Sequence, residues 1–178
     1  MSVRAAIRFL IAFVLALAPL VQAATGAGRY LDVDAYLDSA FPAGVPAPRT
    51  LWVDGELRQA VEDALGSRFP TLRVRYWYDG ATSAWILDEI GKELPITIGV
   101  TVSGDAIDAV RILEFRESRG WEIRYPFFTD QFRGIRLTSE QHLDRRIDGV
   151  TGATLSVRAV TRVARVALIL HDKVSHPT

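Results

Sequence analysis

Hydrophobic and polar positions alternate most regularly in the middle of the chain. Every second residue of 96–102 is Ile or Val, and a second alternating segment, Ile107–Phe115, follows after Ser103-Gly104-Asp105. Alternation with a period of two is typical of a strand with one buried face, and a Gly-containing polar linker is typical of a hairpin turn. Two earlier segments, residues 73–78 and 83–90, also have strand character. The pattern predicts a sheet of neighbouring, mainly antiparallel strands.

Helical periodicity lies toward both ends of the chain. Leu57, Val61 and Leu65 recur at intervals of four, and Gly66 follows as a stop signal. A longer apolar-periodic segment begins near Leu155; the residues expected on its buried face are Val157, Val160, Ala164 and Leu168. Strands in the middle with helices toward both ends predict an α+β fold, with a mainly antiparallel sheet and flanking helices.

The first residues have the pattern of a secretory signal peptide. Arg4 and Arg8 precede an apolar run from Phe9 to Leu20, and small residues follow up to Ala23. We therefore expect residues 1–23 to be a cleaved signal peptide that places the protein in the periplasm. The alternative is an uncleaved anchor in the inner membrane, facing the periplasm. The remaining chain is divided into an N-terminal helical and linker region, 24–70, and a domain at 71–174.

Composition excludes several classes of function. Lys and Arg number 21 and Asp and Glu number 21, so the formal net charge is zero, and nucleic acid is not an expected partner. The chain has no cysteine, which excludes iron–sulfur clusters and covalent c-type haem. His142, His171 and His176 have no ligand spacing, so no metal site is expected. If the protein handles electrons, an organic cofactor must carry them.

The segment DGVTGATLS, residues 148–156, combines glycines and hydroxyl residues directly before the last predicted helix. One interpretation is structural: Asp148 or Thr151 caps the helix, and a glycine permits the turn. The other is that a phosphate binds the free N–H groups and positive dipole end of the helix. Arg158, Arg162 and Arg165 form a stripe further along, which we interpret as a solvated face.

The same segment resembles the flavinylation motif of the FMN-binding domain family, an Asp followed after two residues by Ser or Thr and then Gly-Ala-Thr. This family includes the C subunit of the sodium-pumping NADH:quinone reductase and the G subunit of the Rnf complex. The matching residues are Asp148, Thr151, Gly152 and Ala153, with Gly149 and Leu155 beside them. The resemblance implies that a flavin transferase, with FAD as donor, attaches FMN through a phosphoester to Thr154.

The resemblance extends upstream and covers roughly Tyr76 to the end of the last helix. Glu117-Ser118-Arg119-Gly120, followed by Trp121, stands where the family has a Glu-Thr-Pro-Gly loop, with Arg119 in place of the proline. FFTDQFRG, residues 127–134, resembles the family's Phe-x-x-Gln-Phe-x-Gly. The resemblance implies that Glu117, Ser118, Gly120 and Trp121 lie against the flavin, near the attachment residue.

These features predict an exported electron-transfer flavoprotein with covalent FMN, acting alone or as a subunit of a membrane-linked oxidoreductase. Its expected partners are the flavin transferase and a membrane redox protein such as a cytochrome or a ferric-reductase-like protein. Two alternatives remain. One is an exported, non-catalytic binding module, and the other is a self-contained flavin reductase with a soluble substrate.

Overall fold

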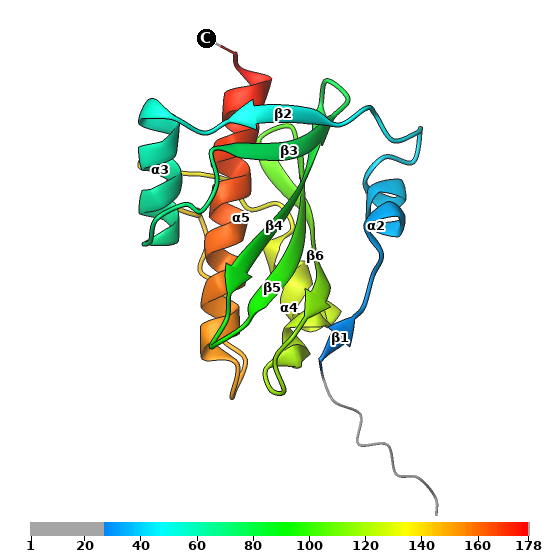
Figure 1. The fold of residues 1–178 in the computed structure, drawn as a ribbon, viewed down its shortest axis with the longest axis vertical. Helices are drawn as coiled ribbons and strands as arrows, with labels where there is room; N and C mark the ends of the chain where they lie inside the picture. The colour runs from blue at the N-terminus through cyan, green and yellow to red at the C-terminus, as the bar shows by residue number, and fades with distance from the viewer. Residues whose placement is uncertain (1–26, 178) are drawn as a thin grey trace, which may run out of the picture.

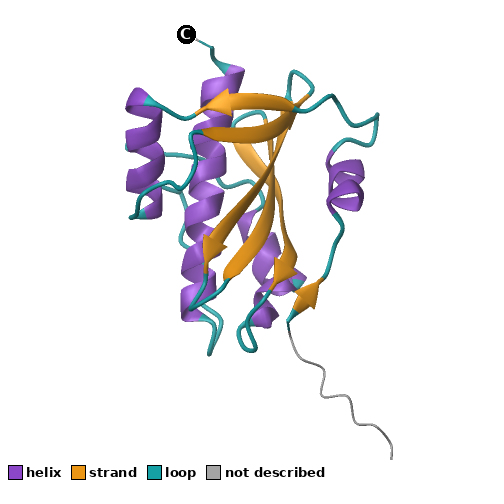
Figure 2. Cartoon of the chain, in the orientation of Figure 1, coloured by secondary structure: helices purple, strands orange, loops and turns teal. Residues whose placement is uncertain are grey.

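A computed structural model describes residues 27–177, so the predicted signal peptide lies outside the described residues. Six strands form one sheet, in which every pair of neighbours is antiparallel (Figures 1 and 2). In sheet order they are β1 (Gly28–Arg29), β6 (Ala106–Phe115), β5 (Pro95–Ser103), β4 (Thr82–Ile90), β3 (Arg73–Tyr78) and β2 (Arg49–Trp52). The predicted α+β class is confirmed.

Helices cover the sheet on both faces, as Figure 1 shows. The long helix α5 (Thr154–Ser175) packs on β4 and β5, and α3 (Gly55–Leu65) packs beside α5. The short helix α2 (Val33–Ala40) lies on the opposite face. Between β6 and α5 the chain forms a 3-10 turn η1 (Trp121–Arg124), a one-turn helix α4 (Pro126–Thr129) and a second 3-10 turn η2 (Asp130–Phe132). Among residues 27–177, no helix has the length and apolarity that a membrane span requires.

The main core lies between the sheet and α5. The Ile and Val side chains at alternate positions of β5 are fully buried, as the alternation predicted. The residues expected on the buried face of the last helix, Val157, Val160, Ala164 and Leu168, are all buried there. α3 ends where the sequence predicted, at Gly66, whose φ of 68° is in the left-handed region that favours glycine.

The opposite face of β5 is also buried, which the alternation of β5 does not reveal. The Tyr36 hydroxyl on α2 lies 3.1 Å from Thr101 Oγ1, within hydrogen-bonding distance. A Cβ placed on Gly99 would lie 2.8 Å from the Tyr36 ring, so only glycine admits this close packing. α2 thus makes a second, smaller core with Trp77 and Leu113.

Both edge strands come from the region before residue 71, for which the sequence indicated only helices and a linker. β1 pairs with the end of β6, and β2 pairs with β3. With two and four residues, these strands are too short to show a clear alternation. Their strand conformation comes from pairing with neighbours that are distant in the sequence.

Candidate functional site

The helix α5 begins without a side-chain cap. Its N-cap residue is Ala153, which has no side chain able to accept a hydrogen bond, and no other side chain caps the helix. The interpretation that Asp148 or Thr151 caps this helix is therefore wrong. The first amide groups of the helix are left as hydrogen-bond donors, at the positive end of a 22-residue dipole.

The backbone just before α5 leaves open space in front of these donors. Gly152 has a φ of +80°, and a Cβ placed on it would meet no atom within 4 Å. Of the two glycines in this segment, Gly152 rather than Gly149 is the left-handed one. Such a conformation favours glycine, and the missing side chain keeps the approach to the helix open.

The residues of the motif differ in exposure. Asp148, Gly149, Thr151, Gly152, Thr154 and Leu155 are exposed, whereas Ala153 and Ser156 are buried. Thr154 carries a hydroxyl and is the first residue of α5. Because its side chain is exposed, a molecule in solution can approach it.

Gln131 holds the beginning of the motif. Its side-chain oxygen accepts a hydrogen bond of 2.7 Å from the backbone N–H of Asp148. Gln131 belongs to η2, within the segment FFTDQFRG that resembles a family pattern, and that resemblance is the signal by which it could have been found. It was not among the site residues predicted from the sequence.

Gly120 lies directly against the start of α5. A Cβ placed on it would lie 2.9 Å from Ser156 Oγ and 3.3 Å from Ala153 Cβ, and its φ is +88°. Both the close packing and the backbone conformation therefore require glycine. The predicted proximity of the 117–121 loop to the start of the last helix is present at this residue.

Glu117, from the same loop, faces a different part of the molecule. Its Oε1 accepts hydrogen bonds from the backbone N–H groups of Lys92, Glu93 and Leu94, at 2.5, 2.9 and 3.2 Å. These residues form the turn between β4 and β5. Burial acts to raise the pKa of Glu117, but the three amides outweigh it and hold the pKa below its usual range. The carboxylate therefore stabilises this turn, a role that the sequence did not reveal.

Trp121 is half-buried within a cluster of aromatic side chains around Arg124. The guanidinium carbon of Arg124 lies 4.8 Å from the centroid of Trp121, 5.0 Å from that of Tyr125 and 4.3 Å from that of Tyr30. Distances below about 6 Å are those of cation–π contacts. Ser118, in contrast, is exposed.

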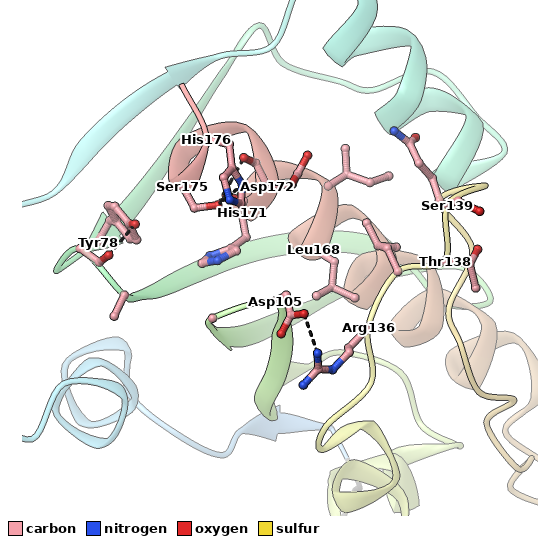
Figure 3. Close-up of a pocket in the computed structure, with 16 residues that line it drawn as sticks. Tyr78, Asp105, Arg136, Thr138, Ser139, Leu168, His171, Asp172, Ser175 and His176 are labelled. Carbon is pink, nitrogen blue, oxygen red and sulfur yellow. Dashed lines mark hydrogen bonds and ion pairs between the residues drawn. The ribbon is translucent and has the colours of Figure 1, made fainter. Parts of the chain in front are cut away.

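A cavity of about 800 Å³ lies near the C-terminal end of α5 (Figure 3). It is lined by His171 and Asp172 of α5 and by the Asp105–Arg136 ion pair, which Figure 3 marks with a dashed line. His171 is 17 residues from Thr154, which corresponds to roughly 25 Å along a helix. This cavity is therefore separate from the motif.

Three buried polar groups next to this cavity are linked by hydrogen bonds. Trp85 Nε1 donates to Ser83 Oγ at 2.7 Å, and Ser83 Oγ lies 2.7 Å from His171 Nδ1. The serine oxygen accepts from the tryptophan, and which partner donates in the Ser83–His171 hydrogen bond depends on the tautomer of the imidazole. Burial lowers the pKa of His171, although the carbonyl of Gly104 and the charge of Asp172 act in the opposite direction. Ser83 is fully buried, which suits a structural network.

Residues 91–169 match the family model of the FMN-binding domain. They run from the turn held by Glu117, through β5, β6 and the Gly120 loop, to most of α5. No curated protein and no solved structure matches the chain. The chain thus contains a domain of the FMN-binding domain family, and flavin binding is the function that this domain indicates.

Proposed function

We propose that the protein is an exported electron-transfer flavoprotein that carries FMN on Thr154 through a phosphoester. The observation that carries the proposal is the position of Thr154. It is exposed, it is the first residue of a helix without a side-chain cap, and it follows Gly-Ala in a domain of the FMN-binding family.

The start of α5 fits the phosphate of FMN. The first amides of the helix supply donors, and the helix dipole favours a negative charge at this end. The open space at Gly152 gives the phosphate oxygens access to those donors. In contrast, a side chain that capped the helix would have competed for the same N–H groups.

In the proposed attachment, the FMN phosphoryl group is transferred from FAD to Thr154. The Thr154 hydroxyl oxygen forms a bond to the phosphorus in the FMN half of FAD, the pyrophosphate P–O bond breaks, and AMP leaves. A threonine hydroxyl is a weak nucleophile at neutral pH, so its proton must pass to a base. The proposed base belongs to the flavin transferase, and the exposure of Thr154 allows that enzyme to reach it.

Different roles are proposed for the residues of the 117–121 loop. Gly120 brings the loop backbone against the start of α5, so the neighbouring Ser118 and Trp121 are the proposed flavin contacts. Glu117 is not a proposed flavin contact, because its carboxylate binds the backbone of the turn between β4 and β5.

When bound, FMN supplies reversible acceptance and donation of electrons, and the protein sets its orientation and potential. The proposed redox partner is a membrane protein, such as a cytochrome or a ferric-reductase-like protein, that brings electrons across the bilayer. Export is proposed because residues 1–23 have the pattern of a signal peptide. N-terminal sequencing of the native protein tests this, since cleavage predicts a start at Ala24 and an anchor predicts retention of Met1.

Attachment is tested by co-expression with a flavin transferase. After denaturing electrophoresis, in-gel flavin fluorescence and intact mass should show FMN on the wild type and none on Thr154→Ala. Thr151→Ala, which removes an exposed hydroxyl three residues away, should weaken the attachment without abolishing it. Fluorescence that persists in Thr154→Ala would place the attachment elsewhere.

A further inference from the structure

A groove of about 510 Å³ runs along the N-terminal half of α5. It lies between α5, the end of α3 and the segment that precedes the motif. Five arginines line it, and we call it the arginine groove: Arg145, Arg146, Arg158, Arg162 and Arg165. No Asp or Glu is among its lining residues. The stripe that the sequence analysis interpreted as a solvated face is thus one wall of a concave site.

The positive charge of the groove is poorly compensated. Arg162 pairs with Glu89 at 2.9 Å, yet its Nε is buried without a hydrogen-bond partner. None of the other four arginines forms an ion pair with a carboxylate within residues 27–177. Like charges gathered in one groove repel each other, so an anion bound between them would be favoured.

The chemistry of the groove selects among anions. Arginine binds phosphate oxygens in a bidentate manner, and several arginines suit a phosphate group with more than one charge. The groove is also lined by the apolar side chains of Leu143, Ile147 and Val157, which an inorganic ion would not contact. The volume falls within the range of about 300–1,000 Å³ of small-molecule sites. These features together fit a ligand with a phosphate end and an apolar end.

We propose that the arginine groove binds a nucleoside phosphate, specifically the adenosine phosphate half of the flavin donor. The identity of the nucleoside rests on the proposed function, in which AMP is the group that leaves when FMN is attached. Arg158 is one helical turn after Thr154 and therefore on the same side of α5. The groove thus begins next to the attachment residue and extends away from it.

Binding is tested by isothermal titration calorimetry on the purified full chain, without a transferase. ADP should bind the wild type, and adenosine and pyrophosphate should each bind at least about tenfold more weakly. The double variant Arg146→Gln/Arg158→Gln should weaken ADP binding at least about tenfold. The matched control is Arg68→Gln/Arg75→Gln, which removes two exposed arginines outside the groove and should leave ADP binding unchanged.

Several outcomes would overturn the proposal. Absence of ADP binding by the wild type would do so, as would equal binding of pyrophosphate and ADP, which would indicate an unselective anion cluster. Binding to phosphatidylglycerol vesicles without binding to ADP would assign the groove to a membrane surface instead. The titrations of the wild type with ADP, adenosine and pyrophosphate test the proposal even if a variant fails to fold. A protein that carries FMN on Thr154 but does not bind ADP overturns this inference alone, whereas ADP binding without FMN on Thr154 overturns the proposed function.

Discussion

Gly120 packs so tightly against Ala153 that a Cβ on the glycine would lie 3.3 Å from the Cβ of the alanine. These residues are distant in the sequence, yet their contact joins the loop after β6 to the N-cap of α5. The 117–121 loop and the segment 148–156 therefore meet at Gly120, and substitutions at this contact should affect both.

Gly120→Ala should destabilise the fold. Its left-handed backbone costs about 1–2 kcal/mol for an L-residue, and overpacking against Ala153 and Ser156 adds about 1–3 kcal/mol. Urea denaturation measures the sum. Gly104→Ala is the control, since Gly104 also has a positive φ but a Cβ there would meet nothing within 4 Å. Equal losses in the two variants would show that the close packing contributes nothing. The double variant Gly120→Ala/Ser156→Ala should recover part of the loss.

Glu117→Ala should lower the free energy of unfolding by about 2–3 kcal/mol, because three backbone amides lose a charged acceptor. Glu117→Gln retains an acceptor oxygen and should cost less. The pKa of Glu117 is lowered in the folded protein, so its contribution is full above the unfolded pKa of about 4.3 and is lost as the pH falls through the folded value. Denaturation at pH 7 and pH 3.5 should show a smaller difference between wild type and Glu117→Gln at the lower pH.

His171 should make the protein less stable at mildly acidic pH. Burial lowers its pKa in the folded state, so below about pH 6.5 the unfolded chain takes up the proton first. The contribution is therefore full above the unfolded pKa and declines as the pH falls. Denaturation at pH 7.5 and 5.5 should show a smaller pH dependence in His171→Asn, which keeps a side chain that can hydrogen-bond Ser83. A pH dependence in His171→Asn equal to that of wild type would contradict the assignment.

Gln131→Ala should reduce the rate of flavin attachment with little effect on stability. The substitution removes the acceptor of the Asp148 N–H and frees the beginning of the motif, while the exposed backbone group can bond to water. Gln131→Glu keeps an acceptor and should retain most of the rate. Time courses of in-gel flavin fluorescence with a fixed amount of transferase measure this effect. If Gln131→Ala is attached as fast as wild type, the hydrogen bond has no positioning role.

The sequence by itself determined the elements with a strong local signal. The alternation of β5 and β6, the periodicity of α3 and α5 and the stop at Gly66 follow from where each segment must bury its apolar side chains. The segment 148–156 was also recognisable locally, because its glycines and hydroxyl residues stand in succession directly before a helix.

The tertiary structure decided the features that depend on contacts between distant segments. The resemblance singled out Gly120 and Glu117, but only the folded chain shows that Gly120 packs against Ala153 and that the Glu117 carboxylate binds the turn at 92–94. The arginine stripe became one wall of a groove only when the segment before the motif folded beside α5. Likewise, β1 and β2 are strands because their partners supply hydrogen bonds that no local pattern encodes.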